Sequence, residues 1–388
     1  MAKSTKRTKK IYLDYASSAL SSSANPGAIH DLGVKEKNKL ENVRAIIAKI
    51  LDARQDEIVF TSGATESNNL AILGLVRNYK SPHIVTTNIE HASVLEVYKY
   101  LEQTKQARVT FVPVEKNGVV DIKKIKKALR KDTVLVSVMY ANNEIGTIQP
   151  IREIGKVIRH FNKINFKENK KTRLPARQVF FHTDAVQAVN YLPVNVMQLG
   201  VDLMSINSAK IYGPKGVGVL YVKKNTSITK IMFGGDQERG LRPGTENVVL
   251  ATEFARALEI TEKIKEQETK RLTKLRDYFV AELLRMKIII NGDLKNRLPN
   301  NINITIPKIP SDLLVIELST RGIMASAKSA CKSGDGKASH VIEAINPKAK
   351  ETDGSLRFSL GRQTTKSDID YTVKALSQIL TKLKKWYD

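Results

Sequence analysis

The sequence contains one cysteine, Cys331, among 388 residues. A single cysteine excludes an internal disulfide and the paired-cysteine motifs of metal sites, so we predict no metal site. A lone cysteine is usually a buried structural residue, although it can also be a nucleophile. Its neighbours decide between these roles, because segment 327–337 carries three lysines that favour the thiolate and two glycines that permit motion. This segment is too polar for a core, and we predict a reactive cysteine.

A long apolar stretch is also missing. No segment approaches the roughly 20 apolar residues that a membrane-spanning helix needs. Residues 1–10 contain five lysines or arginines, but the apolar core of a signal peptide does not follow them. We interpret residues 1–10 as a disordered basic tail, with a short organellar presequence as the alternative. We expect a cytoplasmic protein without membrane contact.

Acidic and aromatic residues are scarce. The chain has 39 acidic against 64 basic residues, a net charge of +25, and 6% aromatic residues. A positive field of this size attracts nucleic acid or acidic proteins. The aromatic residues are not interleaved with basic clusters, which argues against a base-stacking surface. Because the charge is spread along the whole chain, contact with tRNA is one interpretation and a lysine-rich proteome is another.

Short apolar runs alternate with helical segments along the first two thirds of the chain. The strand-like runs are 57–60, 83–87, 108–112, 134–139, 179–182, 203–206 and 217–222. The helical segments between them include 66–79, 94–103, 122–130 and 151–161. This alternation predicts an α/β fold with a mostly parallel seven-stranded sheet flanked by helices. Segment 162–177 is polar, basic and without periodicity, so we expect a surface insertion there.

The length of the chain predicts two domains, because a single core rarely grows to this size. We expect a large domain over residues 11–250. From residue 251 a long charged helix begins, followed by short strands at 288–290 and 302–306 and by a closing helix at 366–387. These elements predict a smaller α+β domain over residues 251–388, which carries Cys331.

Polar residues follow several of the predicted strands, where parallel sheets bind their ligands. Hydroxyl and glycine residues at 61–69 enter a helix, which predicts either an anion site or simple N-capping by Ser62 or Thr65. His91 follows the second strand and could stack on a planar ring, shuttle protons or cap a helix. Asp184 follows an apolar run, so it should be partly desolvated and need a proton-bearing partner.

Lys210 lies between two apolar runs, next to a turn rich in glycine and proline. One interpretation is a lysine that extends from the turn into solvent. The other is a buried lysine whose lowered pKa provides the neutral amine of a Schiff base. An anion site, a ring-stacking histidine, a buried acid and such a lysine are the parts that a pyridoxal phosphate enzyme requires, with the acid paired to the pyridine nitrogen.

Longer motifs extend this pattern along the chain. They are Tyr12-Leu13-Asp14-Tyr15-Ala16, Phe60-Thr61-Ser62-Gly63-Ala64-Thr65-Glu66-Ser67-Asn68-Asn69-Leu70-Ala71, Glu90-His91, Asn142-Asn143-Glu144-Ile145-Gly146, His182-Thr183-Asp184-Ala185-Val186-Gln187-Ala188, Lys210-Ile211-Tyr212-Gly213-Pro214-Lys215-Gly216, Gly244-Thr245-Glu246-Asn247, Ser329-Ala330-Cys331 and Arg357-Phe358-Ser359-Leu360-Gly361-Arg362. Through these motifs the chain, from Ile11 to about Leu380, resembles the cysteine desulfurases of the NifS/IscS type. These belong to the class V aminotransferase branch of the fold-type I pyridoxal phosphate enzymes.

The resemblance implies a role for each matching residue. The implied cofactor-binding residues are Ala64, Thr65, His91, Asn143, His182, Asp184, Gln187, Ser208, Lys210 and Thr245. Among them, Lys210 forms the Schiff base, Asp184 pairs with the pyridine nitrogen, and His91 stacks on the ring and takes part in catalysis. Thr245 reaches the phosphate of the other subunit, which implies a homodimer.

The substrate implied by the resemblance is L-cysteine. Arg357 binds its carboxylate, with Asn143 nearby, and Cys331 attacks its sulfur, so that alanine leaves and a persulfide remains. This sulfur would pass to acceptor or scaffold proteins for iron-sulfur cluster assembly or tRNA thiolation.

The sequence departs from the family pattern at several positions. Ala209 replaces the usual histidine before the lysine, Asn207 replaces a phosphate-binding serine although Ser208 is adjacent, and Lys328 replaces a glycine. Two alternatives therefore stand beside the cysteine desulfurase. One is a related pyridoxal phosphate lyase or aminotransferase, and the other is a degraded member that acts as a binding scaffold.

Overall fold

The computed structural model describes residues 13–14, 16–17, 23–172, 178–327, 339–349 and 353–387. Its centre is a seven-stranded sheet with the order β1-β7-β6-β5-β4-β2-β3. The strands are β1 (Ile58–Thr61), β2 (His83–Thr87), β3 (Arg108–Val112), β4 (Thr133–Ser137), β5 (Phe180–Asp184), β6 (Leu203–Asn207) and β7 (Gly218–Val222). Only β7 runs against its neighbours β1 and β6, so the predicted mostly parallel seven-stranded sheet is confirmed.

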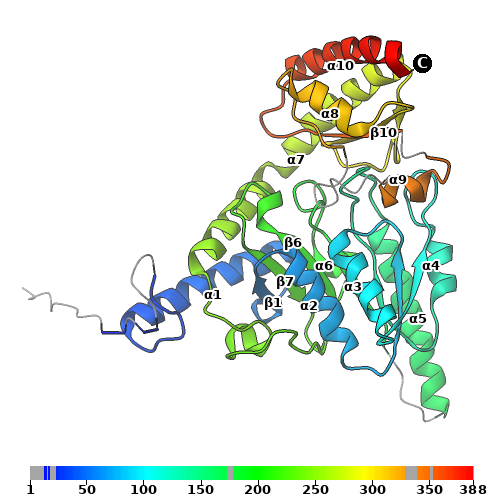
Figure 1. Cartoon of the computed structure of the whole chain (residues 1–388). Coiled ribbons are helices and arrows are strands. Elements are labelled where there is room, and N and C mark those ends of the chain that lie inside the picture. The colour runs from blue at the N-terminus through cyan, green and yellow to red at the C-terminus, as the bar shows by residue number, and fades with distance from the viewer. Residues whose placement is uncertain are drawn as a thin grey trace, which may run out of the picture.

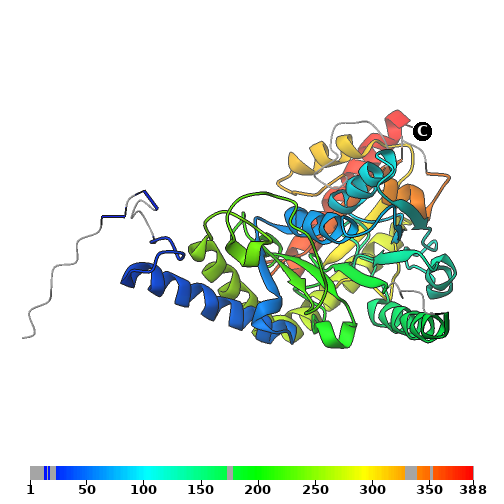
Figure 2. The same cartoon turned by 90° about the horizontal axis from the view of Figure 1, so that it is seen from below.

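Helices cover both faces of this sheet, which explains why its inner strands are continuous apolar runs rather than alternating ones. The elements of this domain outside the sheet are α1 (Asp31–Leu51), η1 (Gln55–Glu57), α2 (Ala64–Val76), α3 (Ala92–Gln103), α4 (Ile122–Ala128), α5 (Ile151–Thr172), α6 (Val196–Leu199), η2 (Ser208–Lys210) and η3 (Gln237–Gly240). Leu70 of α2 and Tyr98 of α3 belong to the core on one face, whereas Ile47 of α1 and Ile154 of α5 belong to the core on the other. Figure 2 shows this three-layer arrangement from below.

A smaller domain follows, built on a three-stranded antiparallel sheet with the order β10-β9-β8. Its elements are β8 (Ile289–Ile290), β9 (Asn301–Ile306), α8 (Ser311–Ser319), β10 (Gly354–Ser359) and α10 (Lys366–Tyr387). Helix α9 (His340–Ile345) lies between α8 and β10 in the chain, but its buried residues Val341, Ile342 and Ile345 belong to the core of the large domain. Figure 1 shows this sheet with α8 and α10 above the large domain. Its core includes Phe279, Ile304 and Phe358.

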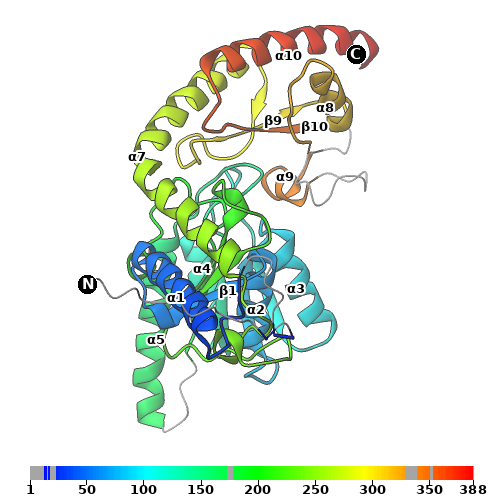
Figure 3. The same cartoon turned by 90° about the vertical axis from the view of Figure 1, so that its left-hand side faces the viewer.

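The two domains are joined by one unbroken helix, α7 (Val248–Arg285), of 38 residues. Figure 3 shows this helix running from the large sheet to the small domain. Phe254 and Leu258 near its start belong to the core of the large domain, whereas Leu272 and Leu283 belong to that of the small one. The division between the two cores therefore lies within α7, between Leu258 and Leu272.

The segment expected as a surface insertion, 162–177, is helical as far as Thr172, because α5 continues to that residue. On the outer part of this helix, the side chains of Ile164 and Phe166 are exposed. Among the described helices, none is long and apolar enough to cross a membrane.

Candidate active site

A cavity of about 450 Å³ lies between the two domains, at the ends of the parallel strands. Its walls include residues from seven separate segments of the chain. Of the residues predicted from the sequence, the cavity is lined by Ala64, Thr65, His91, Asn143, Asp184, Gln187, Lys210 and Arg357. The structure therefore brings eight of the predicted site residues to one place.

Asp184 is the last residue of β5 and is 6% exposed, as expected of a desolvated acid. Asn68 of α2 donates from Nδ2 to Asp184 Oδ2 at 2.8 Å, and the backbone N–H of Val186 donates to Oδ1 at 3.0 Å. These two donors stabilise the carboxylate and fix its orientation. Asp184 was expected to need a proton-bearing partner, and Asn68 is one such partner. Asn68 belongs to one of the sequence motifs, but no role was predicted for it.

The same asparagine connects Asp184 to His91. Asn68 Nδ2 also donates to Ser93 Oγ at 2.8 Å, and Ser93 Oγ lies 2.8 Å from His91 Nδ1. Nδ1 further accepts the backbone N–H of Ser93 at 3.1 Å, so it is an acceptor and the ring proton of the neutral form is on Nε2. His91 is the N-cap of α3, which confirms one of its three predicted roles, and it also lines the cavity.

The first turn of α2, where the sequence predicts an anion site, lies at the cavity. The N-cap is Gly63, and no side chain caps the helix, so the alternative of N-capping by Ser62 or Thr65 is wrong. Ala64 and Thr65 line the cavity at this turn. Uncapped N–H groups at the start of a 13-residue helix favour an anionic group.

Lys210 ends the short helix η2, directly after β6, and its side chain is exposed in the open cavity. The expectation of a buried lysine between two strands is therefore wrong, because η2 carries the residue past the edge of the sheet. Asn190 Nδ2 donates to the Lys210 carbonyl at 2.5 Å and fixes the backbone at this point. Asn207 and Ala209 line the cavity beside it.

Three predicted cofactor residues lie outside this cavity. His182 is fully buried within the sheet, 2.9 Å from Ser137 Oγ and 3.2 Å from Ser205 Oγ, and burial lowers its pKa to about 3. Ser208 is also buried, and its Oγ lies against Gly213, where an added Cβ would come within 2.2 Å. Thr245 is exposed on the surface of the chain.

Arg357 brings the small domain to the cavity. It lies on β10, and its Nη1 donates to the Asn143 carbonyl at 3.1 Å while Nη2 donates to Ser326 Oγ at 3.2 Å. Its Nε is buried without a hydrogen-bond partner in the described part of the chain. Burial lowers the pKa of the guanidinium, and the nearby Glu144 partly offsets this. An under-satisfied cation of this kind suits an anionic substrate group.

The chain matches the family described as Aminotransferase class-V over residues 2–372. It is 42% identical to the cysteine desulfurase IscS of Dictyoglomus turgidum, over 97% of this chain and 96% of that protein. The chain belongs to the NifS/IscS branch of the class-V aminotransferases. A solved NifS-like protein superposes with a TM-score of 0.83 at 35% identity, covering 93% of this chain and 92% of that one. A structure described as SspA in complex with cysteine gives a TM-score of 0.70 at 32% identity, over 87% of this chain and 90% of that one.

The predicted nucleophile Cys331 lies outside the residues that the structure describes, and so does Lys328. The described residues on either side of this segment form hydrogen bonds with residues in or next to the cavity wall. Before it, Ser326 pairs with Arg357 through two backbone hydrogen bonds of 2.7 and 3.1 Å. After it, Ser339 Oγ donates to Glu144 Oε2, and His340 Nε2 lies 3.1 Å from the Glu90 carbonyl oxygen.

Two residues that line the cavity were not among the site residues predicted from the sequence. Tyr212 lines the cavity, with its backbone at a φ of 65° and the Arg362 guanidinium 4.0 Å from its ring centre. Asn300, directly before the small domain's central strand β9, also lines the cavity. Asn300 does not follow a strand of the large sheet, so the strand-end rule gave no signal for it, whereas Tyr212 follows β6 within a quoted motif but was not singled out.

Proposed function

We propose that this protein is a pyridoxal phosphate-dependent cysteine desulfurase, which converts L-cysteine to L-alanine and keeps the sulfur as a persulfide on Cys331. The observation that carries this proposal is the convergence of Lys210, Asp184, His91 and Arg357 on one cavity. Its family membership and the names of its relatives support the same activity.

The side chains around the cavity fit pyridoxal phosphate in their chemistry. The uncapped start of α2 offers N–H groups for a phosphate, the Asp184 carboxylate offers a partner for a protonated ring nitrogen, and His91 offers a flat surface for the ring. The primary amine of Lys210 is available in the open cavity for a Schiff base. When bound, the cofactor withdraws electrons from the carbon skeleton of the amino acid.

The chain's own residues would then bind the substrate and move its sulfur. Arg357 binds the carboxylate of L-cysteine, and its contacts to Asn143 and Ser326 hold the guanidinium in place. The Cys331 thiolate attacks the substrate sulfur, so that a sulfur–sulfur bond forms and the substrate's carbon–sulfur bond breaks. The electron pair left on the carbon takes up a proton, and L-alanine leaves.

A homodimer completes the proposal. Thr245 is exposed and lies outside the cavity of its own subunit, as required of a residue that reaches the phosphate of a second subunit. Large apolar side chains are also exposed, among them Ile29 at 97% and Phe233 at 80%, and an interface would cover such residues. We further propose a cytoplasmic location and transfer of the persulfide sulfur to acceptor proteins.

The decisive experiment measures alanine release and visible absorbance together. We expect purified protein to absorb in the visible range and to release alanine from L-cysteine. Lys210→Ala should abolish both signals, while Cys331→Ser should keep the absorbance and stop alanine release. Lys215→Ala is the matched control, because Lys215 is an exposed lysine of the same turn outside the cavity.

The same assay separates the alternatives. Alanine release that persists in Cys331→Ser would refute the persulfide mechanism and favour a related lyase. Turnover of another amino acid in place of cysteine would favour a related aminotransferase. Protein that shows no visible absorbance with added pyridoxal phosphate would refute the enzyme assignment as a whole.

A further inference from the structure

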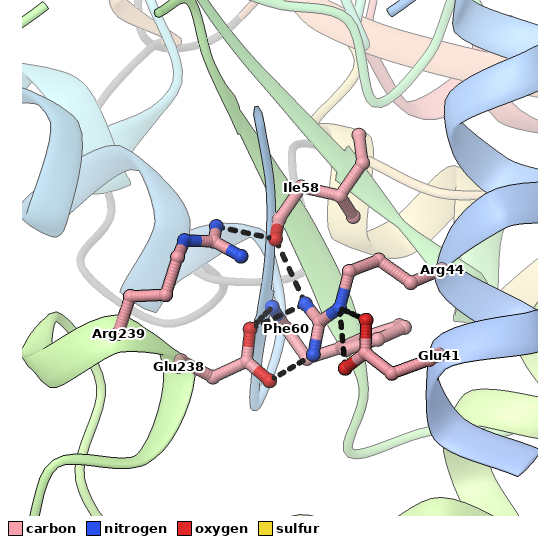
Figure 4. A network of polar contacts seen from close by, with 6 residues as sticks. All are labelled: Glu41, Arg44, Ile58, Phe60, Glu238 and Arg239. Carbon is pink, nitrogen blue, oxygen red and sulfur yellow. Dashed lines mark hydrogen bonds and ion pairs between the residues drawn. The ribbon is translucent and has the colours of Figure 1, made fainter. Parts of the chain in front are cut away.

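Strand β1 lies at one edge of the large sheet, and charged side chains bond the backbone groups along its outer side. The backbone N–H of Phe60 donates to Glu238 Oε2 at 2.9 Å. The carbonyl of Ile58 accepts from Arg44 Nη1 and from Arg239 Nη2, both at 2.8 Å. Figure 4 shows these side chains standing where a neighbouring strand would otherwise lie.

Arg44 and Glu238 form the centre of this network. Arg44 donates from Nη1 and Nη2 to the two oxygens of Glu238, at 2.7 and 2.8 Å, and the two side chains are 5% and 1% exposed. Arg44 Nε donates to the more exposed Glu41 at 3.2 Å. Because the bidentate pair is buried and also bonded to the backbone, loss of one partner would leave the other buried charge without its main counter-charge.

The segment that carries Glu238 is held in an unfavourable backbone conformation. Glu238 and Arg239 have φ angles of 47° and 57°, in the left-handed region that residues with a side chain seldom adopt. Two such residues in sequence persist only where surrounding contacts over-determine them. The bonds from Glu238 and Arg239 to β1 are such contacts.

The same segment is attached a second time, beyond the turn that follows β1. Arg242 Nε donates to Glu66 Oε1 at 2.9 Å, and the backbone N–H of Ser62 donates to Glu66 Oε2 at 2.7 Å. Segment 237–242 therefore contacts the strand before the turn at 61–65 and the helix after it. Its position fixes that of the turn, and with it the direction of the N–H groups at the start of α2.

We propose that Glu238 is a positioning residue for the phosphate group of the cofactor, acting with Arg44 through the turn at 61–65. This inference rests on the proposed function, because it requires the phosphate to bind at the start of α2. The segment also leads directly to Thr245, the residue assigned to the partner's phosphate. One buried ion pair would thus align phosphate contacts in both active sites of the dimer.

The test compares cofactor affinity with and without the phosphate group. Cofactor-free protein is titrated with pyridoxal phosphate and, separately, with pyridoxal, and binding is followed by visible absorbance. Glu238→Gln keeps the size of the side chain but removes its charge. We expect this variant to bind pyridoxal phosphate about tenfold more weakly, since a charge-assisted contact that aligns the turn is lost, and to bind pyridoxal with unchanged affinity.

Glu41→Gln is the matched control, because Glu41 contacts Arg44 but neither β1 nor segment 237–242. It should bind both ligands like the unaltered protein. If Glu238→Gln fails to fold, Arg44→Lys takes its place, since it keeps the charge and loses the bidentate geometry. The same selective loss is expected of it.

Two results would overturn the inference while the proposed function stands. In one, the variant loses affinity for both ligands equally, which indicates general destabilisation. In the other, it binds pyridoxal phosphate normally. If the unaltered protein binds no pyridoxal phosphate, the proposed function itself fails and this inference fails with it.

Discussion

The buried carboxyl group of Glu90, directly before His91, should make the stability of the protein depend on pH. Its side chain is fully buried, and it contacts Thr87 Oγ1 at 2.6 Å and the Met139 backbone N–H at 3.0 Å. Burial raises the pKa of Glu90 from 4.5 to about 8, although the hydrogen bonds from Thr87 and Met139 act in the opposite direction. The folded protein therefore holds a neutral carboxylic acid here at neutral pH.

The sign of the effect follows from proton linkage. Between pH 4.5 and about 8 the folded state keeps a proton that the unfolded state has released. The contribution of this proton to stability is complete below pH 4.5 and is lost as the pH rises through about 8. One proton corresponds to about 1.4 kcal/mol per pH unit, or on the order of 4 kcal/mol between about pH 5 and 8.

The perturbation that tests this is Glu90→Gln, whose amide has the same shape and does not titrate. As the pH rises from about 5 to 8, the unaltered protein loses stability and the variant does not. The melting temperature of the variant minus that of the unaltered protein should therefore rise by about 5 °C for a chain of this length. Melting curves are recorded without cofactor at one fixed protein concentration, because ligand binding and dimerisation shift the midpoint. Glu96→Gln on the outside of α3 serves as the control, since the Glu96 carboxylate is 57% exposed. Parallel pH curves for Glu90→Gln and the unaltered protein would refute the reasoning.

Three further predictions concern the cavity. Arg357→Lys loses the planar fork that would bind a carboxylate, so KM for L-cysteine should rise about thirtyfold, for a loss on the order of 2 kcal/mol. Asn68→Ala removes the donor to Asp184, so pyridoxal phosphate should bind about tenfold more weakly in an absorbance titration, and unchanged binding would contradict the proposed role of this contact. Ala209→His should tighten cofactor binding about fivefold in the same titration, because an added hydrogen-bond donor in the cavity is worth about 1 kcal/mol; weaker binding would show that the cavity has no room for the ring.

The sequence predicted the large sheet well because most of its strands are buried on both faces and are therefore rich in apolar residues. It did not predict that the helix beginning at Ile151 continues to Thr172, because the polar and basic composition of 162–172 is equally typical of an irregular surface segment. The rule that ligands bind at strand ends found His91, Asp184 and Lys210, which all reach the cavity. It could not find Asn68, whose importance depends on a contact with a residue 116 positions away.

The burial of individual residues was the harder part of the prediction. Lys210 and Ser208 are two residues apart, yet one is exposed in the cavity and the other is buried against Gly213. Which of them faces the cavity depends on the single turn of η2, and neighbouring residues in such a turn point in different directions. The composition and the hydrophobic pattern of the sequence do not predict that single turn. The direction of each side chain is therefore known only from the structure.

The side chains along the outer side of β1 also bear on how copies of this protein behave in a crowded solution. An edge strand with free N–H and C=O groups is a template on which another chain can add a strand, and natural sheets obstruct such edges with charge. Here Arg44, Glu238 and Arg239 already occupy the hydrogen-bonding groups of Ile58 and Phe60. With these groups already bonded, another copy of the protein cannot add a strand to this edge, and this should reduce edge-to-edge aggregation.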